Sequence, residues 1–358
     1  MTAASLKFEE LYHEARSCYE AGKHRECEAL LDRLSDLRVG LFRRRRAANL
    51  MLDFAYQTDR RENFLAALDS RYVTRSLGST NYDYWCKLSA LPLMETVWPG
   101  RSVTLPLRQV GPVDHSLYGV DVTVNGRRLL AVIDNCAADY CDITTDLAVQ
   151  LGVRPIGKKI RLNGNRRKRA YIGMVDTLTL GDLVLNNVLF SVSDRDEALA
   201  EEYPFDVILG ANVLRRTGDM ILNHAAKTVT FSLTTLDLPQ NVFCAYPGHG
   251  YYVDGLLDEK EISMLLDFGC TNTNLNKHCY SSQLKGNVYP ESSTTSVNTL
   301  ENTRFAFCGA VCELPRVNIL LRDNGAENLS GKLGTDILRR YRLVVFNARK
   351  QYLKLFPE

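Results

Sequence analysis

Residues 118–138 read YGVDVTVNGRRLLAVIDNCAA, and residues 249–271 read HGYYVDGLLDEKEISMLLDFGCT. Both stretches have the same order: an apolar run with interspersed polar residues, a polar turn, a second apolar run, and an aspartate beside small or polar residues. Asp134 directly follows the second apolar run of the first stretch, and Asp267 directly follows that of the second. Alternation with period two is typical of β-strands, so each stretch is predicted to be a hairpin that ends in an aspartate.

A second shared block follows each aspartate at a similar distance. Residues 209–231 read LGANVLRRTGDMILNHAAKTVTF, and residues 333–356 read LGTDILRRYRLVVFNARKQYLKLF. In each block a strand ends in glycine, which lets a backbone pass close to the aspartate loop because it has no side chain. Asn212 or Asp336 then lies near the start of a short helix. Two blocks in the same order predict a duplicated unit that contributes one carboxylate from each copy.

This order of strand, aspartate loop and LG-helix block resembles the aspartic peptidases of the retropepsin and pepsin clan. The resemblance implies that Asp134 and Asp267 are a catalytic dyad that shares one proton and holds a water. Like charges a few Å apart do not both ionise readily, so one acid stays protonated while the other acts as base. The implied reaction is hydrolysis of peptide bonds, with neither a metal nor a cofactor.

The residues after the two aspartates depart from the family pattern of Asp, then Thr or Ser, then Gly. The chain has Asp-Asn-Cys at 134–136 and Asp-Phe-Gly at 267–269. In the family the hydroxyl residue ties the two loops together. Asn135 can make part of that contact and Phe268 cannot, so the interlock is expected to be asymmetric or absent. Cys136 adds a side chain where the family keeps bare backbone. Two hypotheses therefore stay open: an active peptidase, or a pseudoprotease that binds a peptide or protein in its cleft.

The resemblance also implies a flap, a hairpin that closes over bound peptide after the first aspartate. Residues 156–173, IGKKIRLNGNRRKRAYIG, fit this place, with Asn163 and Gly164 at the turn. A matching hairpin is expected to begin at Ser296. Tyr171 is expected to line the cleft or to pack beneath the flap. The candidate substrate-binding residues are Asn135, Cys136, Phe268, Gly269 and Tyr171.

The N-terminal part of the chain has helical periodicity. Residues 18–34, CYEAGKHRECEALLDRL, align with residues 55–71, AYQTDRRENFLAALDSR. A helix, a tight turn and a second helix in each copy resemble tetratricopeptide-type (TPR-like) repeats. This region is predicted to dock a substrate or a protein partner and to carry no catalytic residue.

The predicted fold class is therefore multidomain, with α and β parts in sequence. A helical-repeat domain at residues 1–98 precedes a two-lobed, mostly β, aspartic-protease-like fold, with one lobe at residues 99–236 and the other at residues 237–358. Because one chain holds both lobes, no second copy is needed to complete the site, and a monomer is expected.

Composition narrows the remaining classes. A formal net charge of +2 over 358 residues gives no global signal for nucleic acid or for a membrane. The basic run Arg43 to Arg46 covers more than one helical turn, so it is interpreted as a solvated helix face that pairs with acids of a neighbouring helix.

The sequence has neither the apolar segments that mark membrane insertion or export nor the spacing that marks a metal site. No stretch approaches the roughly 20 apolar residues that cross a bilayer, and the N-terminus lacks a signal-peptide pattern. A cytoplasmic location is expected, or a periplasmic or secreted one if an export signal was removed. The ten cysteines form no CxxC pair and no histidine completes a zinc spacing, so no metal is expected.

Overall fold

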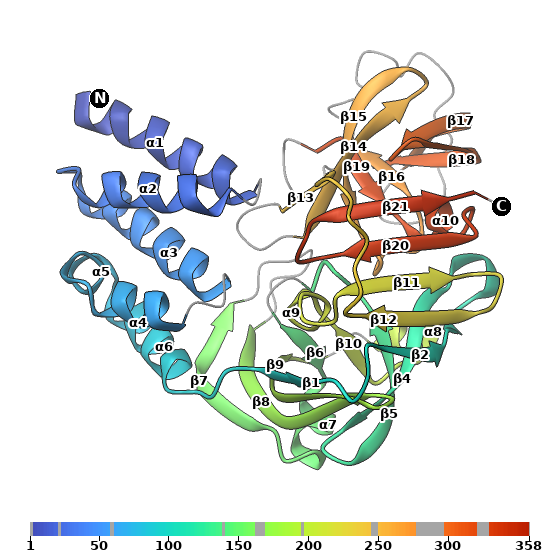
Figure 1. The fold of residues 1–358 in the computed structure, drawn as a ribbon, viewed down its shortest axis with the longest axis horizontal. Helices are drawn as coiled ribbons and strands as arrows, with labels where there is room; N and C mark the ends of the chain where they lie inside the picture. The colour runs from blue at the N-terminus through green and yellow to red at the C-terminus, as the bar shows by residue number, and fades with distance from the viewer. Residues whose placement is uncertain are drawn as a thin grey trace. The chain divides into compact units, whose positions relative to one another are not determined.

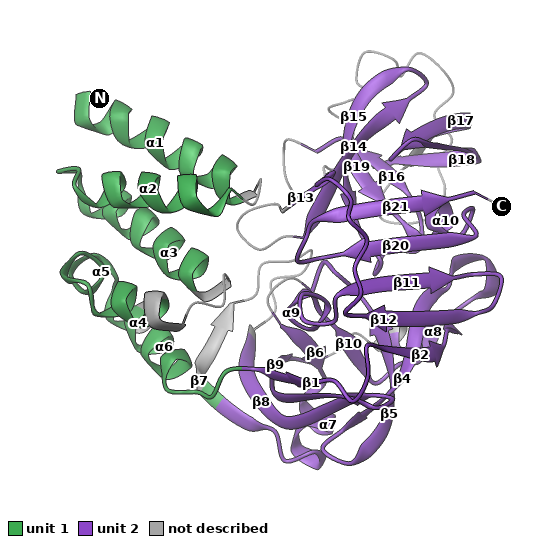
Figure 2. Cartoon of the chain, viewed as in Figure 1, with its two compact units in different colours: residues 1–93, 156–158 green, residues 94–155, 159–358 purple. Residues whose placement is uncertain are grey.

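The computed structural model describes residues 3–20, 23–57, 61–137, 140–161, 169–194, 197–244, 250–276, 297–320 and 329–357. The chain divides into two compact units (Figure 2). The first, the helical unit, comprises residues 1–93 and 156–158. The second, the β unit, comprises residues 94–155 and 159–358. Among the described residues, no helix is both long enough and apolar enough to span a membrane.

The helical unit consists of successive helices whose apolar faces form its core. They are α1 (Ala3–Glu20), α2 (His24–Ser35), α3 (Leu41–Gln57), α4 (Arg61–Asp69), α5 (Arg71–Ser76) and α6 (Ser79–Ser89). Helix α1 packs on α2, and α3 packs on α4. Within the basic run, Arg43 and Arg46 of α3 each form an ion pair of 2.9 Å with Glu9 of α1. These two arginines therefore join neighbouring helices, as the sequence predicted.

The β unit opens with three short strands, β1 (Glu95–Val97), β2 (Ser102–Pro106) and β3 (Arg108–Val110), and the 3-10 turn η1 (Val113–His115). Its first half then contains β4 (Leu117–Val124), β5 (Arg127–Ile133), β6 (Cys141–Ile143), α7 (Thr145–Gln150), β7 (Arg154–Arg161), β8 (Arg169–Leu180), β9 (Leu183–Val192), α8 (Glu197–Glu202), β10 (Val207–Leu209), α9 (Ala211–Leu214), β11 (Asp219–Asn223) and β12 (Thr228–Ser232).

Its second half contains β13 (Val242–Cys244), β14 (Tyr251–Leu257), β15 (Lys260–Leu266), β16 (Asn274–Asn276), β17 (Val297–Phe307), β18 (Ala310–Leu320), β19 (Gly331–Leu333), α10 (Thr335–Leu338), β20 (Leu343–Asn347) and β21 (Tyr352–Phe356). Figure 1 shows these elements along the chain.

Strand pairing in the first half recurs in the second. Strand β4 pairs with β5 and β8, β5 runs parallel to β10, β10 pairs with β6, and β6 runs parallel to β9. Correspondingly, β14 pairs with β15 and β17, β15 runs parallel to β19, β19 pairs with β16, and β16 runs parallel to β18. The short helices α9 and α10 follow β10 and β19 at the same place in each half.

The predicted flap is described only at its two strands. Strands β7 and β8 are neighbours in the first sheet, whereas the turn at Asn163 and Gly164 lies outside the described residues. The hairpin expected to begin at Ser296 is formed by β17 and β18. By its pairing it corresponds to β8 and β9, so the expectation that it matches the flap is wrong.

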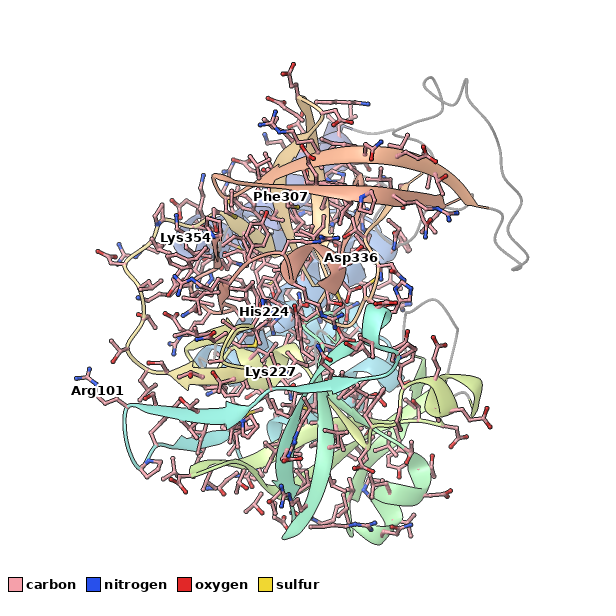
Figure 3. The ribbon with its side chains drawn as sticks, turned by 90° about the vertical axis from the view of Figure 1, so that its right-hand side faces the viewer. Arg101, His224, Lys227, Phe307, Asp336 and Lys354 are labelled. Atoms are coloured by element: carbon pink, nitrogen blue, oxygen red, sulfur yellow. The ribbon has the colours of Figure 1, made fainter. Side chains whose placement is uncertain are left out.

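A third sheet joins the two halves, with strand order β2-β12-β11-β20-β21. Its central pair is β11 of the first half and β20 of the second, in which Met220 lies opposite Phe346. Figure 3 shows the molecule from the side, with His224 and Lys227 in the connection from β11 to β12. One sheet therefore carries strands from both halves, and Phe346 on β20 contacts Phe268, which follows β15.

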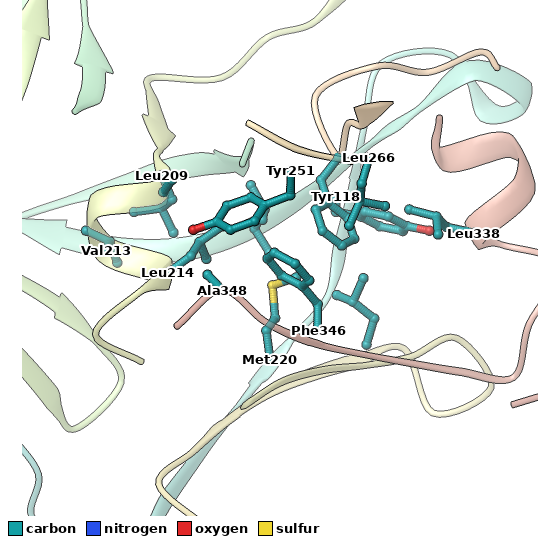
Figure 4. Packing of buried hydrophobic residues seen from close by; sticks show 14 of the residues in the cluster. Tyr118, Leu209, Val213, Leu214, Met220, Tyr251, Leu266, Leu338, Phe346 and Ala348 are labelled. Atoms are coloured by element: carbon teal, nitrogen blue, oxygen red, sulfur yellow. The ribbon is translucent and has the colours of Figure 1, made fainter. Parts of the chain in front are cut away.

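Aromatic side chains fill the core where the halves meet (Figure 4). The ring centre of Phe346 lies 5.3 Å from the ring centre of Tyr251 and 5.4 Å from that of Phe268. An arginine from each half contacts a tyrosine of the other half. Arg215 of the first half donates to the Tyr251 hydroxyl at 2.9 Å. The Arg339 guanidinium of the second half lies 5.4 Å from the ring centre of Tyr118 in the first half.

Candidate active site

Asp134 and Asp267 occupy equivalent positions at the ends of β5 and β15. The Asp134 N–H donates to the Leu209 carbonyl at 3.0 Å, and the Asp267 N–H donates to the Leu333 carbonyl at 3.0 Å. Each aspartate is therefore anchored to the LG block of its own half. The close approach of the two backbones that the sequence predicted is present in both halves.

Glycine makes this approach possible. A Cβ atom on Gly210 would lie 2.5 Å from the Ala137 carbonyl oxygen, and one on Gly334 would lie 2.9 Å from the Cys270 carbonyl oxygen. Non-bonded atoms do not come this close to a real Cβ, so a side chain at either position would displace the aspartate loop.

The two carboxylates are held alike and lie close together. Cys136 N–H donates to Asp134 Oδ1 at 2.8 Å, and Gly269 N–H donates to Asp267 Oδ1 at 3.0 Å. A carboxylate oxygen of Asp134, one of Asp267 and the Sγ atom of Cys136 all lie within 4.8 Å of one another. One water that hydrogen-bonds two oxygens spans roughly 4.5 Å between them. The two carboxylates are thus close enough to hold the same water.

Burial raises the pKa of Asp134 to about 7, and the neighbouring charge of Asp267 adds to the rise. The hydrogen bond from Cys136 N–H and the charge of Lys332 act in the opposite direction and are outweighed. Two such close acids titrate as a pair, so this pKa describes the proton that the pair retains longest. In mildly acidic solution, the pair therefore retains that proton.

Lys332 is a site residue that the sequence analysis did not identify. Its Nζ lies 2.8 Å from Asp267 Oδ2, and the two side chains are only 17% and 5% exposed. Burial is the largest single influence and lowers the pKa of Lys332, but Asp267, Cys136 and Cys270 together raise it by more, so the ammonium stays charged. The sequence did hold a signal: Lys332 interrupts the short strand β19, whereas its counterpart β10 reads Val-Ile-Leu.

Asn135 makes two hydrogen bonds that link the two loops. Its Nδ2 donates to the Leu266 carbonyl at 2.6 Å, and its Oδ1 accepts from Phe268 N–H at 2.8 Å. Phe268 is fully buried and packs against Phe346 and Tyr118. The interlock is therefore asymmetric, with a polar contribution from the first half and an apolar one from the second.

Cys136 and Gly269 follow the two aspartates at the same distance but surround them differently. A Cβ on Gly269 would lie 2.4 Å from Asp134 Cγ, so only glycine fits beside that carboxylate. The Cys136 thiol instead lies 3.5 Å from the Leu266 carbonyl oxygen. Burial, followed by the charges of Asp267 and Asp134, raises the pKa of Cys136 well above its usual range. The thiol is therefore neutral, which argues against a nucleophilic role because the thiolate is the reactive form.

Tyr171, the remaining candidate substrate-binding residue, lies on β8. It lies opposite Val192 and packs, partly buried, against the hydrophobic core. The hydrogen bonds and ion pair that build the aspartate cluster come from residues 134–136, residues 266–269 and Lys332.

The cluster contains two carboxylates and a thiol, a donor set that could attract a divalent cation. The ammonium of Lys332 already occupies Asp267 Oδ2 at 2.8 Å, and the Cys136 thiol keeps its proton because its pKa is raised. A cation would have to displace the ammonium and to ionise the thiol. The arrangement is therefore better suited to proton transfer than to metal binding.

Residues 120–213 match the family model of aspartyl proteases. The matched stretch runs from β4 to α9 and includes Asp134, Asn135 and Cys136. For this part of the chain, the match supports an aspartic peptidase. A search of curated proteins finds no match.

Solved structures similar to this chain include three from different sources. An aspartic proteinase from Irpex lacteus is 13% identical, with 72% of this chain and 97% of that chain covered and a TM-score of 0.49. A retropepsin-like aspartic protease from Rickettsia conorii is 16% identical, with 39% and 92% covered and a TM-score of 0.27. Basic 7S globulin from soybean is 12% identical, with 72% and 95% covered and a TM-score of 0.41.

Proposed function

We propose that this chain is an aspartic endopeptidase with two retropepsin-like lobes, residues 99–236 and 237–358, each of which supplies one aspartate. The observation that carries the proposal is the approach of Asp134 and Asp267, whose oxygens lie within 4.8 Å. The recurrence of strand pairing in the two halves supports an internal duplication as the origin of the site.

In the proposed reaction, a water lies between the two carboxyl groups. The ionised aspartate takes a proton from this water while the water oxygen attacks the peptide carbonyl carbon. The protonated aspartate donates its proton to the carbonyl oxygen, which gives a neutral diol. Transfer of a proton to the amide nitrogen then allows the C–N bond to break, and the dyad returns to its starting state with one proton.

The test is cleavage of a broad peptide mixture from acid to neutral pH, followed by mass spectrometry. Wild type is expected to cleave. Asp134→Asn and Asp267→Asn are each expected to lose about 100-fold or more of the rate, the usual contribution of a general acid or base. Asp182→Asn removes an exposed carboxylate in the β8–β9 turn and is the matched control. Cleavage that both active-site variants retain would refute the proposal.

A pseudoprotease that binds a peptide or protein in its cleft is the second candidate, and the Cys136 side chain beside the dyad favours it. The thiol lies within 4.8 Å of both carboxylates, where the resemblance implies bare backbone. Binding of peptides by wild type without cleavage at any pH, and with Cys136→Gly equally inactive, would establish this second function in place of the first.

For the helical unit we propose a TPR-like docking role toward a substrate or protein partner. Two successive helix pairs, α1 with α2 and α3 with α4, support it. Because one chain supplies both aspartates, we also propose that the monomer is the active species. Activity that rises in proportion to concentration, rather than with its square, is the expected result in dilute solution.

A further inference from the structure

Lys332 makes the two halves of the aspartate cluster electrically different. In the first half, Ile208 lies opposite Val132 in the pairing of β10 with β5. In the second half, Lys332 lies opposite Leu265 in the equivalent pairing of β19 with β15. One half therefore presents an apolar side chain at this position, and the other presents an ammonium to its aspartate at 2.8 Å.

The two carboxylates are the anionic partners of Lys332 in the cluster. Asp267, Cys136 and Cys270 act on the pKa of Lys332, and the charge of Lys332 in turn acts on the pKa of Asp134. Burial raises the pKa of both thiols, that of Cys270 to about 12, so neither is an anion near neutral pH. With one proton on the dyad, the ammonium and one carboxylate leave the site neutral, whereas a dyad without a counter-ion would be negative.

We propose that Lys332 is a positioning residue that keeps Asp267 ionised and so makes Asp267 the base and Asp134 the acid. The ion pair contacts one carboxylate and not the other, which carries this assignment. A buried carboxylate with an ammonium partner favours ionisation, and one without a partner favours protonation. The catalytic part of this inference rests on the proposed function, whereas the ion pair itself does not.

The assignment fixes the direction of each proton transfer. Asp267 takes the proton of water as the water oxygen bonds to the carbonyl carbon, and Asp134 gives its proton to the carbonyl oxygen. Asp267 then passes its proton to the leaving nitrogen, the C–N bond breaks, and Asp134 recovers a proton from the diol hydroxyl. Water is the only co-reactant, and Lys332 keeps its own proton throughout.

The first test is the pH profile of kcat/KM for wild type, Lys332→Met and Lys332→Arg. Methionine keeps an unbranched side chain, one heavy atom shorter, and removes the charge. Loss of the positive charge disfavours the ionised form of the dyad, so both limbs of the profile are expected to move about one pH unit or more toward alkali. Arginine is expected to restore the wild-type position. Limbs that stay in place while the rate falls would overturn the assignment, because a purely structural role lowers the rate without moving the profile.

The second test does not depend on catalysis. Urea unfolding of Lys332→Met, Asp267→Asn and the double variant gives the coupling between the two side chains. Lys332→Met leaves a buried carboxylate unpaired, and the double variant removes that charge. We expect a coupling of at least about tenfold in the unfolding equilibrium constant at neutral pH, with little coupling in acid, where Asp267 is protonated.

The control for this cycle is the exposed ion pair of Lys87 with Asp83 on α6. Lys87 Nζ lies 2.7 Å from Asp83 Oδ2. Its coupling is expected to be several-fold smaller because solvent screens the pair. Equal couplings for the two pairs, or none for Lys332 with Asp267, would overturn the ion-pair role. If the cycle shows the coupling but wild type cleaves no peptide, the proposed peptidase function fails while the ion pair stands.

Discussion

The two halves of the β unit share a backbone scaffold and differ in the side chains placed on it. The bond that anchors each aspartate measures 3.0 Å in both halves, and the turn after each aspartate closes with an N–H to carbonyl bond of 3.2 Å in both. The side chains that follow are Asn135 and Cys136 in one half, and Phe268 and Gly269 in the other.

Some contacts at the aspartates must be made by both halves, whereas others can be made by one half alone. The backbone bonds are needed twice, because each carboxylate needs its own support. The link between the loops comes from the first half, where Asn135 contacts backbone atoms on both sides of Asp267 and the Cys136 thiol contacts the Leu266 carbonyl. Phe268 was then free to become part of the apolar core. Equivalent positions in the two halves thus make one polar and one apolar contribution to the same interlock.

The largest expected effect on this comparison comes from Phe268→Ala. The side chain is fully buried against Phe346 and Tyr118, so its removal is expected to lower the free energy of unfolding by about 3 to 5 kcal/mol. Urea unfolding measures this. Phe243→Ala, which truncates a half-buried ring on β13, is the control and is expected to cost less. A loss below about 1 kcal/mol at Phe268 would show that the apolar contribution is dispensable.

Gly269→Ala and Cys136→Gly change the same position in the two halves in opposite directions. A Cβ at residue 269 would come within 2.4 Å of the Asp134 carboxyl carbon. The resulting displacement is expected to lower kcat/KM about 100-fold or more. Cys136→Gly removes a thiol from beside the dyad and is expected to keep cleavage. Loss of cleavage in Cys136→Gly but not in Gly269→Ala would contradict both expectations, because the thiol and not the glycine would then be required beside the dyad.

The polar interlock predicts a somewhat smaller effect for Asn135→Ala. The Leu266 carbonyl and the Phe268 N–H would lose their Asn135 partner in a buried place, at a cost of about 2 to 3 kcal/mol in the free energy of unfolding. Asn135→Thr restores a group that both donates and accepts, so it should recover part of the loss. Equal stability of the alanine and threonine variants would mean that these two hydrogen bonds do not hold the loops together.

The smallest effect is a dependence of stability on pH. The pKa of Asp134 is raised in the folded state, so its contribution to stability is present at acid pH and is lost as the pH rises toward about 7. Between mildly acid and neutral pH the free energy of unfolding is expected to fall by about 1 to 2 kcal/mol. Asp134→Asn should remove most of this slope. A slope of the same size in the variant would place the titrating group elsewhere.

The sequence predicts the scaffold well because its signals are local. Strand alternation and the repeated LG blocks place Asp134 and Asp267 at equivalent strand ends, and glycine at residues 210 and 334 indicates the close backbone approach. These features depend on residues near one another in the chain.

The contacts that differ between the halves depend on residues far apart in sequence, so the local pattern cannot supply them. Asn135 bonds to Leu266, which lies in the other half of the β unit. Phe268 is an uninformative departure from the motif until its packing against Phe346 is known. Lys332 lies in an apolar strand pattern, and only the parallel pairing of β19 with β15 brings it to Asp267.

The central claim is that two aspartates from different halves act as one acid pair. Titration of the aspartate carboxyl carbons by NMR, in wild type and in Asp267→Asn, tests it most directly. In wild type, Asp134 is expected to titrate with a pKa of about 7. In Asp267→Asn, its pKa should fall by about one unit or more, because the repulsion from the second carboxylate is gone. A pKa for Asp134 near the ordinary value of about 3.9 in both proteins would show that the two carboxyl groups do not form a pair.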